Sequence, residues 1–361
     1  MYFQTSKYYV LSMIGQGQAH KVFKVQHNLS QKVFAIKIEK YPMQGQIESE
    51  IKFLKELNEI EGIPKLIHHG ITPEKKSYLI LPLLHCSLQD LVKSQQISLS
   101  CTLAIGLSLI ETLEKMHKKS ILHLDIKPEN IMISQKMQLN SENKLLEPGV
   151  IQLIDLGLSQ SIENQKFQKN ILFGSLNFAS RTFHKGEQLG YKDDLESLFY
   201  VLVYLKNCKL PWSQESSKGF KTVDNKLIGE MKTSLFNTIT LSQQFPHEFF
   251  KFMSYIDELQ PNQMPDYSFI KLLFIKMLQT ISINPNSNQL LNYSPIQALN
   301  QLENSETLDF PVKKHLLNND SIQTQIQEDI LDTEHIVVHI SDRIGKYKTV
   351  QIKSISDIKF E

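Results

Sequence analysis

The residues that decide how this chain folds are His123–Asn130, HLDIKPEN, together with Ile154–Gly157, IDLG. Transfer of a phosphoryl group requires a carboxylate at the accepting hydroxyl, a cation on the migrating group and oxygen ligands for magnesium. The two stretches contain these groups in that order: Asp125, Lys127, Asn130 and Asp155. The alternative, a polar loop that joins two helices, would leave this order to chance.

A glycine-containing segment near the N-terminus, Gly15–Val22 (GQGQAHKV), lies between two strand-like runs. A dinucleotide-binding turn joins a strand to a helix, so this context disfavours that fold. It favours a β-hairpin that covers a nucleotide, because glycine lets backbone amides approach phosphate oxygens. A hairpin without a ligand is the alternative for this segment taken alone. The candidate phosphate contacts are Gly15, Gln16 and Gly17.

One lysine, Lys37, lies within the apolar strand pattern FAIKI. Strict alternation places Ala35 on the same face, where both would meet a nucleotide. Such a lysine needs a carboxylate partner, and the following helix offers Glu48 and Glu50. Glu50 has apolar residues three, four and seven positions later, so it lies on the buried stripe and we predict that it pairs with Lys37. The alternative is a lysine whose head reaches solvent and a solvated glutamate.

Composition excludes several classes of protein. The 361 residues include 39 basic and 38 acidic ones, and a net charge of +1 gives no electrostatic reason to expect nucleic acid or a membrane as partner. The three cysteines have no paired spacing, which disfavours both a disulfide framework and a zinc site. No apolar run reaches the roughly 18 to 20 residues that span a bilayer, and the N-terminus lacks a secretory signal, so we expect a cytoplasmic or nuclear protein. Only Arg181 and Arg343 are arginines.

Strand-like and helical patterns divide the chain into three parts. Short β-branched or aromatic runs predict a small antiparallel sheet, interrupted by one helix at residues 47–57. We predict an α+β protein with a β-rich lobe at residues 1–84, a larger helical lobe at 85–285 and a polar tail at 286–361 that ends in two strand-like runs. Further helices are expected at residues 88–92, 100–118, 195–205, 249–259 and 269–278, with Ser87 or Ser100 as N-caps.

These motifs together resemble the eukaryotic protein kinases, and further segments resemble the casein kinase I family within them. Gly174–Thr182 (GSLNFASRT) looks like that family's replacement for the Ala-Pro-Glu motif, and Asp193–Leu198 (DDLESL) is close to its next signature. Pro265–Phe269 (PDYSF) is similar to its late-domain motif, and Leu83–Leu91 to its hinge. The likeness covers about residues 8–280 and implies the bilobal kinase fold.

The resemblance also implies a role for each matched position, with ATP and Mg²⁺ as cofactors. Asp125 would accept the proton of a Ser or Thr hydroxyl, and Lys127 would neutralise charge on the γ-phosphoryl group. Asn130 would complete the catalytic group and, with Asp155, hold magnesium. Lys37 with Glu50 would grip the α- and β-phosphates, and Asp194 would brace the catalytic loop. Around the adenine the resemblance places Ile14, Val22, Ala35, Leu81, Met132 and Ile154, with the Pro82 carbonyl and the Leu84 amide at the hinge.

Two departures from the family bear on regulation and specificity. Leu124 replaces the arginine that in many kinases binds a phosphorylated activation loop, and no arginine precedes Arg181, so we expect activity that does not depend on such phosphorylation. Asn177 replaces an arginine of the family's anion site, so we expect weaker dependence on priming phosphates. Point charges that could partly restore positive potential are Lys185, Lys192, Lys218 and Lys221.

These features predict a serine/threonine kinase that acts, as a monomer, on protein substrates, with an acidic context as the family preference. A pseudokinase or scaffold that uses the fold and the tail for partner binding is the alternative, although every polar group of the motifs is present. A third interpretation gives a partner-binding segment near Val337–Ile355 the main role. The insertion Ser134–Pro148 is longer than the family usually carries.

Overall fold

The computed structural model describes residues 2–5, 7–17, 19–42, 45–137, 142–164, 176–213, 225–235, 245–282, 336–341 and 347–350. Most of the predicted tail lies outside these residues, and so do Lys218 and Lys221, which precede the tail in the sequence. The chain forms two compact units. The first comprises Met1–Asn58, Pro64–Leu84 and Leu308–Glu361, and the second Glu59–Ile63 and His85–Thr307.

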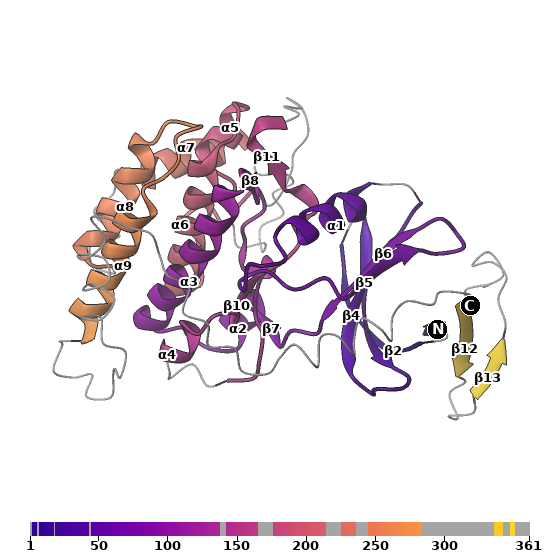
Figure 1. Ribbon diagram of the computed structural model, residues 1–361. Coiled ribbons are helices and arrows are strands. Elements are labelled where there is room, and N and C mark those ends of the chain that lie inside the picture. Colours follow the sequence, from indigo (N-terminus) through magenta and orange to yellow (C-terminus); the bar gives the residue numbers. More distant parts are fainter. Residues whose placement is uncertain are drawn as a thin grey trace, which may run out of the picture. The chain divides into compact units, whose positions relative to one another are not determined.

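The first unit is built on an eight-stranded antiparallel sheet in the order β13-β12-β1-β2-β3-β4-β6-β5 (Figure 1). Six strands come from the N-terminal part of the chain: β1 (Tyr2–Thr5), β2 (Tyr8–Gln16), β3 (His20–His27), β4 (Val33–Glu39), β5 (His68–Ile71) and β6 (Ser77–Pro82). The other two, β12 (Ile336–Ser341) and β13 (Tyr347–Val350), are the strand-like runs near the C-terminus. They pair with each other, and β12 pairs with β1, so the sheet continues into the tail.

The two faces of this sheet differ in chemistry. One face carries a buried apolar cluster, which follows the alternation of the strands: Tyr8, Phe23, Val25, Phe34, Ile36 and Ile80. The residues between them, including Ala35 and Lys37, point to the opposite face. Helix α1 (Gln46–Glu56) follows β4 and buries Ile47, Phe53 and Leu54 together with Glu50. A buried carboxylate on an apolar helix face requires a cationic or hydrogen-bonding partner.

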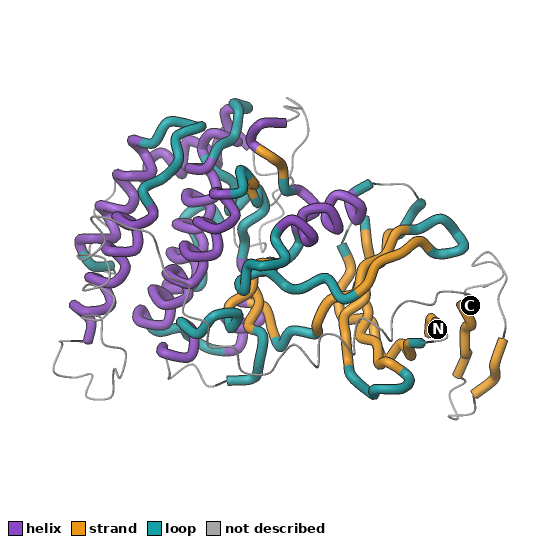
Figure 2. Tube along the Cα trace, in the orientation of Figure 1, coloured by secondary structure: helices purple, strands orange, loops and turns teal. Residues whose placement is uncertain are grey.

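The second unit consists mainly of helices (Figures 1 and 2). The helices are α2 (Leu88–Ser94), α3 (Leu99–Lys118), α4 (Glu142–Leu145), α5 (Arg181–Lys185), α6 (Tyr191–Asn207), α7 (Asn225–Leu235), α8 (His247–Glu258) and α9 (Tyr267–Ser282). Short strands connect them in two sheets: β7 (Cys86–Ser87), β9 (Ile131–Ile133) and β10 (Ile151–Leu153) in one, β8 (Ile121–Leu122) and β11 (Gln160–Ser161) in the other.

Helix α3 is the centre of this unit. A Cβ atom on Gly106 would lie 2.5 Å from the Phe274 ring and 3.1 Å from Leu202, so the glycine lets α6 and α9 pack closely against α3. The Phe252 and Phe274 rings join α8 to α9 edge to face at 5.3 Å. The predicted α+β class is confirmed, with a strand-rich unit and a helical unit.

Helix starts were only partly predicted correctly. Ser87 caps α2 through a reciprocal capping box with Asp90, as expected. Ser100 was the wrong N-cap for α3, because Ser98 has the extended backbone of a cap and its hydroxyl accepts a hydrogen bond from Cys101 N at 3.1 Å. Helices α4, α5 and α7 were not predicted. Among the described helices, none combines the length and apolarity needed to cross a bilayer.

Candidate active site

The carboxylate of Asp125 is held by two side chains of its own loop. Lys127 Nζ donates to Asp125 Oδ2 at 2.6 Å, and Asn130 Nδ2 donates to the same oxygen at 2.8 Å and to the Asp125 carbonyl at 2.9 Å. Pro128 begins a single 3-10 turn, η1 (Pro128–Asn130), because its fixed φ suits the first helical position, and this turn carries Asn130 back to Asp125. Among the described residues none donates to Asp125 Oδ1, so this oxygen is available to accept a proton.

Asp194, in the first turn of α6, fixes the backbone of the same loop from below. Its Oδ2 accepts a hydrogen bond from His123 N at 2.7 Å, and its Oδ1 accepts one from Leu124 N at 2.8 Å. His117 Nε2 lies 3.0 Å from Oδ2. Burial alone would raise the pKa of Asp194, but the hydrogen bond and charge of His117 and the backbone bonds lower it below its ordinary value. Asp194 is therefore an ionised, fully buried brace.

Leu124 has a left-handed backbone, with φ of 65°. A branched residue rarely adopts this conformation, which costs about 1 to 3 kcal/mol unless neighbouring contacts enforce it. The hydrogen bond from Leu124 N to Asp194 supplies such a contact. The loop conformation that presents Asp125 is therefore imposed by Asp194.

His123 links the catalytic loop to the residue that precedes Asp155. Its Nδ1 accepts a hydrogen bond from Asp125 N at 3.2 Å, so the ring proton is on Nε2, which donates to the Ile154 carbonyl at 3.1 Å. Burial lowers the pKa of His123, and the neutral ring fits this pattern. A second link runs from Ile154 N to the Asn130 carbonyl at 2.8 Å. The two stretches quoted first are thus held together by two hydrogen bonds, both to the backbone of Ile154.

Asn130 and Asp155 fit the requirements of a magnesium site. Both hydrogen bonds of the Asn130 amide use its nitrogen, which leaves its oxygen as the ligand atom. Asp155 has a left-handed backbone, with φ of 65°, before the 3-10 turn η2 (Leu156–Leu158). Within the described part of the chain no cluster of three or more His, Cys, Asp or Glu side chains could hold a metal ion. Mg²⁺ commonly takes one or two protein ligands together with substrate phosphates, so this small donor set suits it.

In the first unit, Lys37 and Glu50 form an ion pair. Lys37 Nζ lies 2.7 Å from Glu50 Oε2, and the two side chains are 10% and 1% exposed. Glu48, the other candidate, accepts a hydrogen bond from the Ser77 hydroxyl instead. The stripe of apolar residues around Glu50 thus identified which carboxylate faces β4.

Four predicted nucleotide contacts of the first unit share one face of the sheet: Val22, Ala35, Lys37 and Leu81. In the register of β3, β4 and β6, Val22 lies opposite Lys37, and Ala35 lies opposite Leu81. Gly15 pairs with Val22, and Gly17 N donates to the His20 carbonyl at 3.0 Å in the turn between the strands. The remaining predicted contacts of this unit lie at strand ends or beyond them: Ile14 and Gln16 at the end of β2, Pro82 at the end of β6, and Leu84 two residues later. Met132 on β9 and Ile154 after β10 belong to the second unit.

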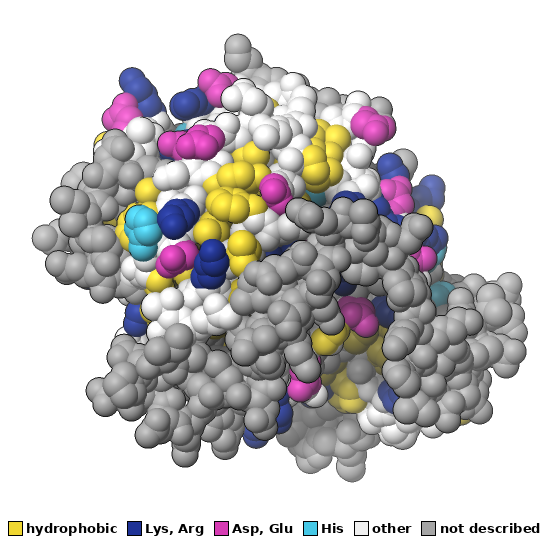
Figure 3. Space-filling view, turned by 60° about the vertical axis from the view of Figure 1, so that its left-hand side comes forward, with side chains coloured by type: hydrophobic (Ala, Val, Ile, Leu, Met, Phe, Trp, Pro, Cys, Tyr) yellow, Lys and Arg dark blue, Asp and Glu magenta, His cyan; other side chains and the backbone are white. Residues whose placement is uncertain are grey.

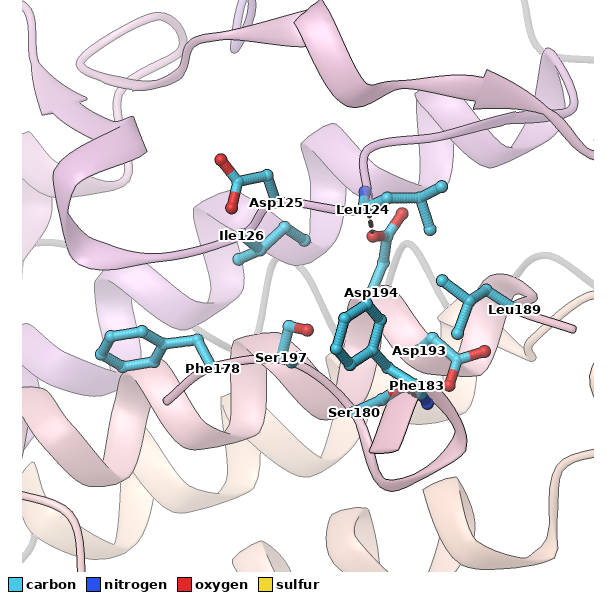
Figure 4. Close-up of a pocket in the computed structure, with 11 residues that line it drawn as sticks. Leu124, Asp125, Ile126, Phe178, Ser180, Phe183, Leu189, Asp193, Asp194 and Ser197 are labelled. Carbon is cyan, nitrogen blue, oxygen red and sulfur yellow. Dashed lines mark hydrogen bonds between the residues drawn. The ribbon is translucent and has the colours of Figure 1, made fainter. Parts of the chain in front are cut away.

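A small pocket lies beside Asp125 in the second unit (Figure 4). Leu124, Asp125 and Ile126 form one side, and Phe178 with Phe183 lies on the other. The rest of the lining comes from Ala179, Ser180, Leu189, Asp193, Asp194 and Ser197. Asp193 is buried, and burial raises its pKa to about 6. The pocket therefore combines apolar side chains with polar groups next to the proposed proton acceptor, and Asp193 is a weakly acidic carboxyl group among them.

Sequence reasoning did not single out His117, which connects Asp194 to helix α9. The Tyr267 hydroxyl lies 2.5 Å from His117 Nδ1, so a buried chain runs from α9 through α3 to Asp194. The available signal was the position of His117 near the end of an apolar helix, six residues before His123. A histidine at such a position is commonly a core residue, and only the structure gives it a carboxylate to hold.

Basic and acidic side chains of the described residues are interspersed with apolar ones across the face seen in Figure 3. Lys185 on α5 and Lys192 on α6 are close in the sequence to the pocket residues Phe183 and Asp193. Asn177 is exposed.

Comparisons with known proteins agree with this geometry. Residues 8–270 match the protein kinase domain family. A probable serine/threonine-protein kinase of Dictyostelium discoideum is 31% identical over 274 residues, which are 73% of this chain and 52% of that protein. A probable casein kinase I homolog of Encephalitozoon cuniculi is 30% identical over 286 residues, which are 76% of this chain and 85% of that protein. Casein kinase I homolog 1 of Schizosaccharomyces pombe is 27% identical over 372 residues, or 97% of this chain and 79% of the relative. The chain belongs to the protein kinase family and, within it, is a divergent member of the casein kinase I type.

Proposed function

We propose that this chain is an active protein kinase that uses ATP and Mg²⁺ to phosphorylate serine and threonine side chains of protein substrates. The observation that carries the proposal is the state of Asp125. Lys127 and Asn130 both donate to Oδ2, and Oδ1 receives no hydrogen bond from a described residue. A carboxylate held through one oxygen, with the other available, can orient a substrate hydroxyl and accept its proton.

The other polar groups serve binding and charge. Lys127, 22% exposed, is placed to neutralise charge on the phosphoryl group in transfer. Asn130 and Asp155 would hold Mg²⁺, which supplies charge neutralisation for the phosphates when bound. In the first unit, Glu50 holds the Lys37 ammonium in place for the nucleotide phosphates. The pocket beside Asp125 would accept the substrate residue next to the acceptor hydroxyl.

Phosphate transfer to casein, measured with the γ-labelled nucleotide, tests this proposal. The Asp155→Ala variant removes one proposed magnesium ligand and should reduce the rate by about a thousandfold, since each 1.36 kcal/mol of transition-state stabilisation is a factor of ten. Equal incorporation by the wild type and the variant would contradict the proposed reaction. No incorporation by either would favour the pseudokinase or scaffold alternative.

We also propose that activity does not require a phosphorylated activation loop. Leu124 occupies the position from which an arginine would bind the phosphate, and the Arg181 guanidinium is bound to Glu196 and Asp257. Treatment of the purified protein with a phosphatase should therefore leave the casein kinase rate unchanged. A loss of activity that maps to a phosphosite between Asp155 and Ser180 would refute this.

Substrate preference follows from the same scarcity of arginine. With Asn177 in place of the family's arginine, positive potential would come from Lys185 and Lys192, which act as point charges. We propose that acidic residues near the acceptor favour phosphorylation moderately and that a priming phosphate is not essential. A peptide array with a steep requirement for phosphate at one fixed upstream position would contradict this.

A further inference from the structure

Lys232, on helix α7, is a completely buried lysine that the phosphotransfer site does not use. Its exposed fraction is 0%, and Glu196, whose charge favours the protonated amine, forms no direct ion pair with it. A buried ammonium without a counterion is costly unless hydrogen bonds and polarisable groups replace its water shell. The contacts of Lys232 therefore indicate what the residue is for.

The ammonium group binds the loop of residues 176–180. Lys232 Nζ donates to the Leu176 carbonyl at 2.8 Å and to the Ala179 carbonyl, and it lies 2.9 Å from His184 Nε2. The Tyr200 ring centroid is 4.8 Å away and the Trp212 centroid 5.2 Å away. Carbonyl dipoles and aromatic faces thus take the place of a counterion.

A third carbonyl of the same loop is fixed by a neighbour of Lys232. Trp212 Nε1 donates to the Asn177 carbonyl at 2.9 Å, and its ring packs edge to face on Tyr200 at 5.1 Å. Three of the four carbonyls from 176 to 179 are thus anchored to buried side chains.

Helix α7 approaches closely enough for this contact because of a glycine. A Cβ atom on Gly229, three residues before Lys232, would lie 2.8 Å from His184 Cβ. Glycine within a helix costs about 1 kcal/mol relative to alanine. The close approach of α7 to α5 is the compensating gain, since it brings the ammonium within reach of the loop.

The opposite side of this loop lines the pocket beside Asp125. Phe178, Ala179 and Ser180 are pocket residues, and Asp125 faces them from the catalytic loop (Figure 4). A displacement of the loop would change the space available to a substrate side chain without moving Asp125. We infer that Lys232 is a positioning residue for the protein substrate: by binding the Leu176 and Ala179 carbonyls, it sets the wall of the pocket that the substrate contacts.

The inference rests on the proposed function for the identity of the ligand, and a binding measurement separates the two. The probe is a fluorescein-labelled peptide with one serine among acidic residues, titrated with the full chain in a fluorescence anisotropy assay. Lys232→Met keeps the length and apolar character of the side chain but leaves two partly buried carbonyls without this donor. The matched control is Lys226→Met, the same change on the exposed side of the same helix, where the lysine is 83% exposed.

Lys232→Met should weaken peptide binding roughly tenfold to a hundredfold, because the loop loses the donor that fixes two of its carbonyls. Lys226→Met should bind like the wild type. In steady-state kinetics the peptide KM should rise by a similar factor while the ATP KM stays within about twofold. A purely structural role would lower kcat through the folded fraction and leave both KM values unchanged. Wild-type protein that binds the peptide but transfers no phosphate would refute the proposed function and leave this inference standing.

If Lys232→Met shows no cooperative unfolding transition, Trp212→Phe takes its place. That variant keeps an aromatic ring beside Lys232 and removes only the donor to the Asn177 carbonyl, so peptide affinity should fall roughly threefold to tenfold. Unchanged affinity in the folded variant, or no binding of the peptide by the wild type, would overturn the inference.

Discussion

Replacing Arg181 with methionine should destabilise the second unit strongly, because this arginine neutralises a buried glutamate. The side chain of Glu196 is 2% exposed and that of Arg181 is 14% exposed. Arg181 Nε donates to Glu196 Oε1 at 3.0 Å, and its Nη2 donates to Oε2 at 3.3 Å, in a bidentate arrangement. The same carboxylate also accepts from Arg181 N at 2.7 Å and from the Tyr200 hydroxyl at 2.5 Å.

The expected loss of unfolding free energy depends on which hydrogen-bond donors to Glu196 remain in the variant. Removing one partner of a buried ion pair costs about 3 to 5 kcal/mol, because the other charge stays buried without compensation. Two donors to Glu196 remain in Arg181→Met, the backbone amide and the tyrosine hydroxyl, so the lower end, about 3 kcal/mol, applies. At about 2 to 4 °C per kcal/mol for domains of 150 to 250 residues, the melting temperature should fall by roughly 6 to 12 °C.

Urea unfolding followed by tryptophan fluorescence measures this loss, since the single tryptophan, Trp212, lies in the same unit. Asp257→Asn is the control: Asp257 also binds Arg181, at 2.8 Å, but it is 56% exposed and such pairs contribute about 0 to 1 kcal/mol. Arg181→Lys keeps the charge but not the fork and should lie between the two. A loss below about 1 kcal/mol for Arg181→Met, or an equal loss for Asp257→Asn, would show that the buried pair is not what stabilises this region.

Two further predictions concern charged groups in the two units. Glu50→Gln should lower kcat/KM for ATP by roughly tenfold to a hundredfold, because Lys37 loses its buried partner. The control Glu48→Gln, on the same helix, should change kcat/KM by less than about twofold. Equal effects of the two variants would refute the assignment of Glu50 as the partner of Lys37. Burial lowers the pKa of Lys232 from 10.5 to about 7, although the negative charge of Glu196 acts to raise it. Between pH 7 and 10 the unfolded chain therefore binds one more proton than the folded chain. The unfolding free energy of the wild type should rise relative to Lys232→Met by up to about 1.4 kcal/mol per pH unit across this window, and parallel curves in urea titrations at pH 7, 8 and 9 would contradict the low pKa. The titratable groups that face Lys232 are His184, Glu196 and Tyr200.

The elements that sequence predicted best are those with an unbroken local pattern. Glu50 was identified because apolar residues at helical spacing show which side of α1 is buried, and burial of the carboxylate follows from that geometry. The N-cap of α3 was harder, since Ser98 and Ser100 are both suitable residues and only the extended backbone at Ser98 distinguishes them.

Contacts between distant segments could not be predicted in the same way. Lys232 follows the buried Ile228 by one helical turn, which is the one local sign that it faces inward. Its three hydrogen-bond partners lie 48 to 56 residues away in the chain. Two of them are backbone carbonyls, which no residue type in the sequence reveals. The pairing of β12 with β1 is a similar case: β12 was visible as a strand-like run, but β1 was not predicted, and a strand pattern does not name its neighbour.

The scarcity of arginine explains why the loop of residues 176–180 is anchored from within the fold. A phosphate-controlled loop needs an arginine fork at the position of Leu124, and this chain has there an apolar side chain that lines the pocket with Phe183 and Leu189 (Figure 4). Arg181, the one arginine among the described residues, is already bound to Glu196. Neither group is available to a phosphate, so the conformation of the loop has to come from contacts that are present in the unmodified chain. The bonds of Lys232 to the loop carbonyls are such contacts, and under the proposals made above they would keep the substrate pocket formed without phosphorylation of the loop.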